Sequence, residues 1–201
     1  MQHGDLMRED DNDLGFDDEF FKSRSKIKNP RAQKKPKIVL ESEEKTPSLI
    51  TKKKKTRGNA YQNTRTGARA DLNGVVCRSS WESDVLRVLQ LFKIPFEFEP
   101  TTFYFPPDVR GRVHAYLPDI YLTQTDEYIE VKGLLDARGR NKLRKFKKHY
   151  PKEFKSLTVI ISKSNKTNKF FFKKLGVQNI LFYEHLKKLY SGKIVNWEGQ
   201  R

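Results

Sequence analysis

Apolar side chains recur at the spacing of helices and strands only from about residue 75 onward. Residues 1–20 hold eight acids and one arginine, and residues 21–69 hold sixteen bases and three acids. Segments this charged bury too little apolar surface to offset the entropy of ordering the chain. The sequence therefore predicts a disordered tail over residues 1–74, acidic and then basic, followed by one folded domain over residues 75–201.

The whole chain carries a formal net charge of +16, which favours an anionic partner. Such a protein binds nucleic acid phosphates without regard to sequence, and an anionic membrane surface would also attract it. No window approaches the roughly 18 apolar residues of a membrane-spanning helix, and the acidic N-terminus lacks the apolar stretch of a secretory signal. The single cysteine, Cys77, fits a reducing compartment. We therefore expect a cytoplasmic protein that binds DNA and no membrane.

Charge is divided unevenly within the expected domain. Residues 70–132 have a net charge of −4, and residues 133–201 have a net charge of +14. An acid-rich half followed by a basic half is the pattern expected of a cation site that faces a phosphate-binding surface.

The periodicity of the domain predicts an α/β fold with a mixed sheet flanked by helices. The expected order is helix, three strands, helix and strand, with a helical segment, a strand and a last helix after them. Ser79 or Ser80 is the expected N-cap of the first helix. The core elements are expected at a helix over 80–92, strands over 95–105, 113–122 and 127–133, a helix over 137–150 and a strand over 156–162.

Three polar residues of the two central strands suggest a metal site. In the strand EYIEVKG, Glu130 and Lys132 share one face, while Ile129 and Val131 face the core. A turn over residues 123–126 brings Asp119 of the preceding strand beside Glu130. Two adjacent carboxylates repel each other unless a cation lies between them. Mg²⁺, with Mn²⁺ as a substitute, takes one or two carboxylates together with water and phosphate oxygens.

The same residues suggest a reaction. A divalent cation held by Asp119, Glu130 and the carbonyl of Val131 would activate water and neutralise charge on a phosphate. Lys132 would place a fixed positive charge near the attacking water. Glu82, in the first turn of its helix, would reach the cation through the water shell.

Three motifs resemble those of the PD-(D/E)xK nuclease superfamily. They are Arg78-Ser79-Ser80-Trp81-Glu82, Leu117-Pro118-Asp119 and Glu130-Val131-Lys132. Together with KIPFEFEP and KLRKFKKHYP they look most like phage-type endonuclease I, a Holliday-junction resolving enzyme. The resemblance covers residues 80–162 and implies a restriction-endonuclease-like core. It also implies that Glu82, Asp119 and Glu130 bind metal and that Lys132 assists the attack.

The resemblance implies a metal-dependent endonuclease acting on branched DNA, as a homodimer, in a phage-infected bacterial cell. RSSWE is also similar to segments of homing nucleases and phage head-completion nucleases, so a sequence-specific enzyme and a virion-associated enzyme stay open as alternatives. A catalytically silent DNA-binding or virion structural protein is the alternative from another class.

A helix rich in bases follows the Glu-x-Lys strand. These bases are expected to divide between solvent and DNA phosphates, and they are Arg138, Arg140, Lys142, Arg144, Lys145, Lys147 and Lys148. Asp136 is expected to cap this helix, and His114 to be a packed or surface residue. Trp197 and Phe170 to Phe172 could stack on an unpaired base, but core packing is the favoured interpretation.

Overall fold

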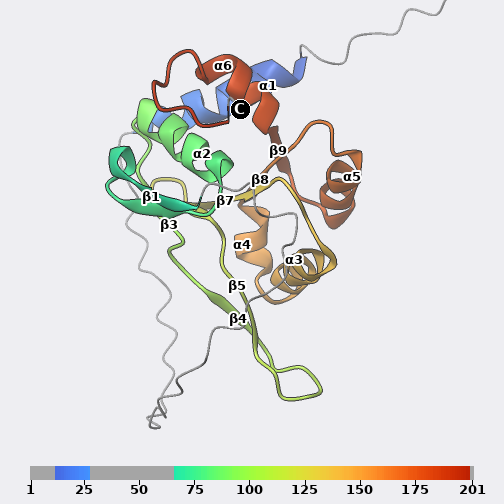
Figure 1. The fold of residues 1–201 in the computed structure, drawn as a ribbon. Coiled ribbons are helices and arrows are strands. Elements are labelled where there is room, and N and C mark those ends of the chain that lie inside the picture. Colours follow the sequence, from blue (N-terminus) through green and yellow to red (C-terminus); the bar gives the residue numbers. More distant parts are fainter. Residues whose placement is uncertain (1–11, 28–65, 200–201) are drawn as a thin grey trace, which may run out of the picture.

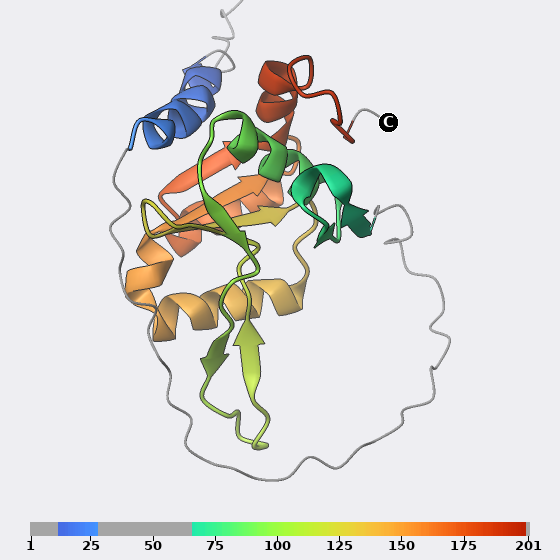
Figure 2. The same cartoon turned by 90° about the vertical axis from the view of Figure 1, so that its left-hand side faces the viewer.

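A central sheet with helices on both faces forms the body of the protein in the computed structural model, which describes residues 12–27 and 66–199 (Figures 1 and 2). Helices α1, α2 and α6 cover one face, and α3, α4 and α5 cover the other. The helices are α1 (Asn12–Ser25), α2 (Ser80–Leu91), α3 (Ala137–His149), α4 (Pro151–Lys155), α5 (Lys166–Leu175) and α6 (Tyr183–Tyr190). The expected mixed α/β architecture is therefore confirmed.

The sheet has five strands in the order β3, β6, β7, β8 and β9. The first three are antiparallel neighbours, whereas β7, β8 and β9 run parallel. A parallel connection needs a crossover, and α3 with α4 and then α5 supply the two crossovers. The strands are β3 (Phe96–Phe98), β6 (Ile120–Leu122), β7 (Glu127–Lys132), β8 (Leu157–Ile161) and β9 (Asn179–Phe182).

Alternation along β7 divides its side chains between the two faces. Ile129 and Val131 enter the core under α1, α2 and α6, as expected. Tyr128 packs in the second core, under α3, α4 and α5. Glu130 and Lys132 have the same parity as Tyr128 and therefore lie on that second face.

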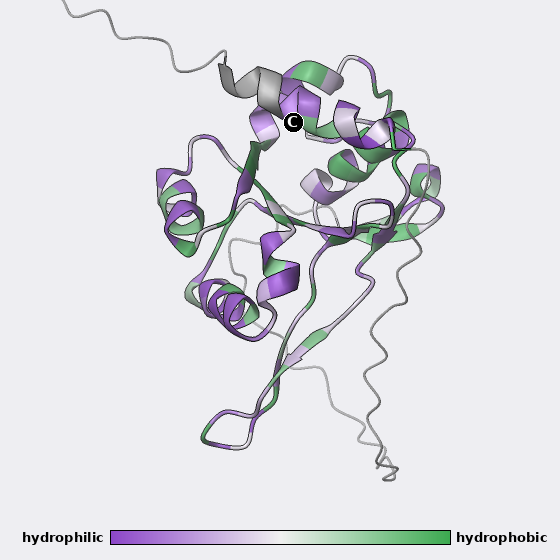
Figure 3. Ribbon diagram, turned by 180° about the vertical axis from the view of Figure 1, so that it is seen from behind, coloured by the Kyte–Doolittle hydropathy of each residue, from purple (hydrophilic) through white to green (hydrophobic). Residues whose placement is uncertain are grey.

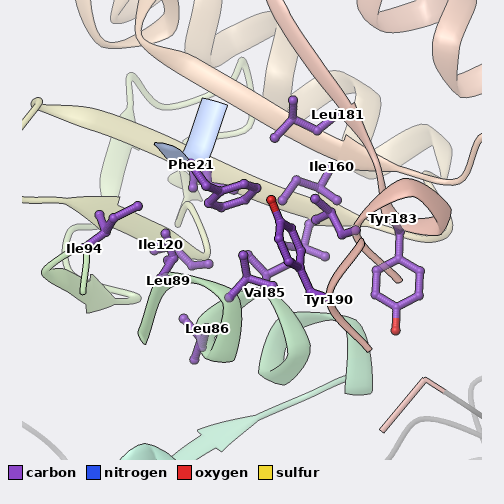
Figure 4. Packing of buried hydrophobic residues seen from close by; sticks show 14 of the residues in the cluster. Phe21, Val85, Leu86, Leu89, Ile94, Ile120, Ile160, Leu181, Tyr183 and Tyr190 are labelled. Carbon is purple, nitrogen blue, oxygen red and sulfur yellow. The ribbon is translucent and has the colours of Figure 1, made fainter. Parts of the chain in front are cut away.

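Helix α1 lies within the stretch for which the sequence predicted a tail, and that boundary is wrong for residues 12–27. Phe21 is fully buried, and its ring centroid lies 6.2 Å from that of Tyr190 (Figure 4). It also packs against Phe92, at a centroid distance of 6.0 Å. Oδ2 of buried Asp17 lies 2.8 Å from Nδ1 of His185.

Helix α1 also makes an ion pair with the sheet. Arg24 donates two hydrogen bonds to the carboxylate of Glu127, at 2.5 and 2.6 Å. Apolar and polar contacts thus attach α1 to the domain.

Residues 66–74 also belong to the domain. They form β1 (Gly67–Arg69) and the short helix η2 (Ala70–Leu72), and β1 pairs with β2 (Val75–Cys77). The predicted tail is therefore folded at this end too, whereas residues 1–11 and 28–65 lie outside the described residues.

Two of the expected strands are each divided in two. The strand over 95–105 becomes β3 and β4 (Phe103–Phe105), and the strand over 113–122 becomes β5 (His114–Tyr116) and β6. Strands β4 and β5 form a separate antiparallel hairpin that projects from the body (Figure 2). Pro100 and Pro118 stand at the two interruptions, where proline disfavours a continuous sheet ladder.

Candidate active site

Asp119 and Glu130 lie side by side on one face of the sheet. Ile120 pairs with Ile129 in the β6–β7 ladder, so the same register continued by one residue places Asp119 opposite Glu130. Both side chains are 2 % exposed. The sequence-based expectation that these two carboxylates share a face is met.

A backbone hydrogen bond fixes the Asp119 carboxylate. The N–H of Val131 donates to Oδ2 of Asp119 at 2.7 Å. Burial, and then the negative charge of Glu130, raise the pKa of Asp119 to about 8, although Lys132 acts in the opposite direction. The single positive charge of Lys132 therefore does not compensate for burial and for the repulsion between the carboxylates of Asp119 and Glu130.

Lys132 joins the two carboxylates. Its Nζ lies 2.7 Å from Oε1 of Glu130 and 3.8 Å from Oδ2 of Asp119. Burial alone would lower the pKa of Lys132, but the charges of Glu130 and Asp119 outweigh it and raise that pKa above its usual range. The amine is thus positively charged at neutral pH.

Glu82 lies at the same cleft but engages its own helix terminus. Ser79 is the N-cap of α2, and its Oγ accepts a hydrogen bond from the N–H of Glu82 at 3.2 Å. The two carboxylate oxygens of Glu82 accept from Ser79 Oγ at 3.0 Å and from the N–H of Arg78 at 2.8 Å. These bonds, which resemble a capping box, hold Glu82 at the lining of the cleft. Its expected role toward a cation stays a prediction.

Tyr116 is a member of the site that the sequence did not indicate. Its hydroxyl donates to Oε2 of Glu130 at 2.8 Å, from the end of the β4–β5 hairpin. Burial, and then the charge of Glu130, raise the pKa of Tyr116 well above its usual value. Tyr116 therefore remains a hydrogen-bond donor, and with Lys132 it holds both oxygens of Glu130. Tyr116 immediately precedes the Leu117-Pro118-Asp119 motif, but only the fold brings it to the carboxylate.

The candidate residues line one cleft of about 470 Å³. Two of the seven bases expected to contact DNA, Arg138 and Lys142, belong to its lining, and Arg78 adds a third base. Further lining residues are Glu82, Tyr116, Leu117, Asp119, Glu130, Lys132, Leu135, Asp136, Gly139 and Leu143. Carboxylates and bases therefore meet in one hollow.

The other five bases of α3 lie elsewhere on the helix. Arg140 and Arg144 lie over the ring of Phe171, with their guanidinium carbons 5.6 and 5.4 Å from its centroid. Lys147 donates to the carbonyl of Leu175 at 2.7 Å and so caps the end of α5. Lys145 and Lys148 are outside the cleft lining as well; Lys148 is exposed and Lys145 lies 6.0 Å from the centroid of the Phe105 ring.

Of the remaining predictions from the sequence, some are confirmed and one is wrong. Asp136 caps α3 as predicted, because its Oδ1 accepts from the N–H of Gly139 at 2.7 Å. His114 lies away from the catalytic candidates, 3.1 Å from Oδ2 of Asp108. Trp197 is buried in the core as favoured, but Phe170 is 68 % exposed, which contradicts core packing for that residue.

The donor set suits a hard divalent cation with few protein ligands. Within residues 12–27 and 66–199, no three histidine, cysteine, aspartate or glutamate side chains are grouped closely enough to hold an ion. Asp119 and Glu130 therefore stand as a pair of carboxylates that line the cleft. One or two carboxylates, completed by water and phosphate oxygens, are what Mg²⁺ usually takes, so the residues fit this cofactor.

No family model, curated protein or solved structure matches the chain. Across the described residues, no helix combines the length and apolar character needed to cross a bilayer.

Proposed function

We propose that this protein is a metal-dependent DNA endonuclease that hydrolyses phosphodiester bonds in the cleft beside β6, β7 and α3. One observation carries the proposal. The buried carboxylates of Asp119 and Glu130 converge on the amine of Lys132 in a cleft that is also lined by bases. Carboxylates that bind cations and bases that bind phosphates are the components that metal-dependent phosphodiester hydrolysis uses.

The topology supports this proposal. Elements α2, β3, β6, β7, α3 and β8 follow one another in the order of helix, three strands, helix and strand that the resemblance implies, with the β4–β5 hairpin inserted. The first three of these strands are antiparallel neighbours and the fourth is parallel to β7. The three segments that resemble PD-(D/E)xK motifs lie at the N-terminus of α2, immediately before β6 and on β7.

Asp119, Glu130 and the carbonyl of Val131 would hold Mg²⁺ or Mn²⁺, with Glu82 acting through water. The bound cation supplies an activated water and neutralises charge on the scissile phosphate. Lys132 keeps a positive charge beside the carboxylates and stabilises the negative charge that develops as the new P–O bond forms. Tyr116 orients Glu130, and Arg78, Arg138 and Lys142 bind the DNA backbone.

We further propose branched DNA as the substrate, and a homodimer as the active form, because a junction needs two incisions. The setting that the resemblance suggests is recombination or DNA processing in the cytoplasm of a phage-infected bacterium. Contacts to phosphates and to the shape of the DNA suit this substrate, because phosphate contacts position DNA without reading its sequence.

The chemistry is tested by nicking of supercoiled plasmid in Mg²⁺ and in EDTA. We expect nicking by the wild type in Mg²⁺ only, and at least about 100-fold slower nicking by Asp119→Asn and Lys132→Ala, the scale of losing one preorganised charge at a reacting phosphate. Asp126→Asn and Lys188→Ala are matched controls. Asp126 lies in the β6–β7 turn, and Lys188 is exposed on α6. Nicking in EDTA, or full activity of both site variants, would refute the proposed site.

The substrate is tested separately by comparing cleavage of a four-way junction with cleavage of linear duplexes that have the arm sequences. Faster cleavage of the junction is expected. Equal rates would remove branched DNA as the preferred substrate while leaving the nuclease chemistry intact.

A further inference from the structure

Helices α3 and α5 form a strongly basic surface beside the cleft. The two helices lie next to each other on the same face of the sheet (Figures 1 and 3). Neither sequence, ARGRNKLRKFKKH or KTNKFFFKKL, contains an acidic residue. Together they carry eleven lysines and arginines. A surface of one charge sign, made by two adjacent elements, attracts a polyanion.

The bases of α3 are divided between two sides of the helix. Arg138 and Lys142, four residues apart, face the cleft. Arg140 and Arg144, also four residues apart, face α5 and flank the ring of Phe171. Helix α3 therefore separates a phosphate-binding side at the cleft from a second basic side that continues onto α5.

Phe170 stands exposed on this second side. Its neighbours Phe171 and Phe172 are half-buried and buried, whereas 68 % of Phe170 is exposed. Lys166, Lys173 and Lys174 are four residues before it and three and four residues after it, and all three are exposed. Residues at these spacings share one face of a helix, so Phe170 and the three lysines lie on the same exposed face of α5.

We propose that Phe170 is a stacking platform for an unpaired base of single-stranded DNA that crosses α3 and lies along α5. Basic side chains bind the backbone of such a strand, and an aromatic ring binds the flat face of its bases. In a duplex the base faces are covered by their neighbours, so Phe170 can recognise only DNA that is locally unpaired. The inference rests on the proposed function, because the strand that reaches α5 is an unpaired strand of the DNA held in the cleft.

Binding in EDTA tests this contact without cleavage. A fluorescently labelled 20-mer of thymidine and a labelled 20-base-pair duplex are titrated with full-length wild type, Phe170→Ala and Phe170→Leu. Both variants are expected to bind the single strand about 5- to 100-fold more weakly, the range for losing one stacked base. Their affinity for the duplex is expected to stay within about twofold, since phosphate contacts remain. Leu91→Ala, at an exposed leucine on the other face of the sheet, is the matched control.

A spectroscopic readout separates stacking from a change in charge or folding. 2-Aminopurine placed in the thymidine strand loses fluorescence when its base stacks on an aromatic ring, so we expect quenching by the wild type and none by Phe170→Ala. Single-strand affinity that is equal in wild type and Phe170→Ala would overturn the proposal. So would an equal loss of affinity for single strand and duplex, or competition by polyglutamate that matches unlabelled single strand.

Failure of this inference differs from failure of the nuclease assignment. If Phe170→Ala nicks plasmid at the wild-type rate in Mg²⁺ but binds thymidine strands as well as the wild type, only the stacking platform is refuted. If neither the wild type nor any variant nicks plasmid, yet Phe170→Ala selectively loses affinity for single-stranded DNA, the nuclease assignment is refuted and the stacking platform is supported.

Discussion

The backbone N–H of Val131 donates a hydrogen bond to Oδ2 of Asp119 across the β6–β7 ladder, at 2.7 Å. Because the donor belongs to the main chain, substitutions of Val131 other than proline leave it in place. An asparagine at position 119 presents a carbonyl oxygen that can accept the same bond, so Asp119→Asn changes charge with little change in shape. This variant therefore isolates the electrostatic part of the site.

Binding of a divalent cation is expected to stabilise the wild type and not Asp119→Asn. A ligand that binds only the folded state at ten times its dissociation constant adds about 1.4 kcal/mol to the free energy of unfolding. Thermal unfolding with MgCl₂, with MnCl₂ and with EDTA measures the effect. An equal rise in melting temperature for both proteins would show that the cation binds elsewhere.

The stability of the metal-free protein should depend on the ionisation of Asp119. Its pKa rises from 3.8 to about 8 on folding, so the protonated form is favoured in the folded state. This contribution to stability is complete below about pH 4 and is lost as the pH rises through about 8. Asp119→Asn is neutral throughout, so its free energy of unfolding relative to the wild type should increase from pH 5 to pH 9. Urea unfolding in EDTA at pH 5, 7 and 9 measures this difference; a constant difference would contradict it.

Tyr116→Phe should weaken the site without disrupting the fold. The substitution removes the donor to Oε2 of Glu130 and leaves a buried carboxylate oxygen with one partner fewer. The expected cost is about 1–3 kcal/mol in the free energy of unfolding. We also expect slower nicking, because Glu130 loses the group that orients it. Tyr104→Phe, at an exposed tyrosine of the same hairpin, is the control. Unchanged nicking by Tyr116→Phe would mean that Lys132 alone holds Glu130 in place.

The cleft bases should determine how strongly DNA binding depends on salt. Each phosphate contact contributes about −0.9 to the slope of log affinity against log salt for duplex DNA. Arg138→Gln and Lys142→Gln, which alter the cleft lining, should each reduce the magnitude of that slope by about this amount. Lys188→Gln, on the other side of the sheet, should leave the slope unchanged. Identical slopes for all three variants would place the DNA away from the cleft.

Helix α1 should be required for stability. Phe21 is fully buried against Phe92 and Tyr190, and truncating a buried phenylalanine to alanine typically costs about 3–5 kcal/mol. Phe21→Ala is therefore expected to lower the urea midpoint strongly. Ser25→Ala, at the exposed end of the same helix, should have little effect. Equal midpoints for Phe21→Ala and the wild type would show that α1 is not part of the cooperative fold.

Local rules predicted the centre of the site. Alternation along β7 placed Glu130 and Lys132 on one face, and the turn after β6 placed Asp119 opposite Glu130. The serines at the start of α2 narrowed its N-cap to Ser79 or Ser80, and the structure has Ser79. Each of these inferences uses residues within a few positions of one another, or one hairpin, where geometry is determined by the chain itself.

Contacts between distant parts of the chain were not predictable in the same way. Asp17 lies beside His185, which is 168 residues later in the chain. Helix α1 has no periodic apolar face from which such a contact could be predicted. Phe20 and Phe21 lie in a stretch rich in acidic and basic residues, which on its own predicts a disordered tail. Only the residues that they contact in the fold show that they belong to the core. The hydrogen bond from Tyr116 to Glu130 likewise needs the break at Pro118, which turns β5 away from β6.

The stacking of Trp81 on Tyr183, with ring centroids 4.1 Å apart, places an indole against the core between α2 and α6, close to the end of β7. Trp81 immediately precedes Glu82, and its ring lies next to Gly133, which follows Lys132. The indole therefore lies next to backbone that carries two of the cleft side chains, Glu82 and Lys132. Titrating the unlabelled protein with Mg²⁺ or DNA in a fluorimeter would follow occupancy of the cleft optically, with no substrate turnover and no attached dye.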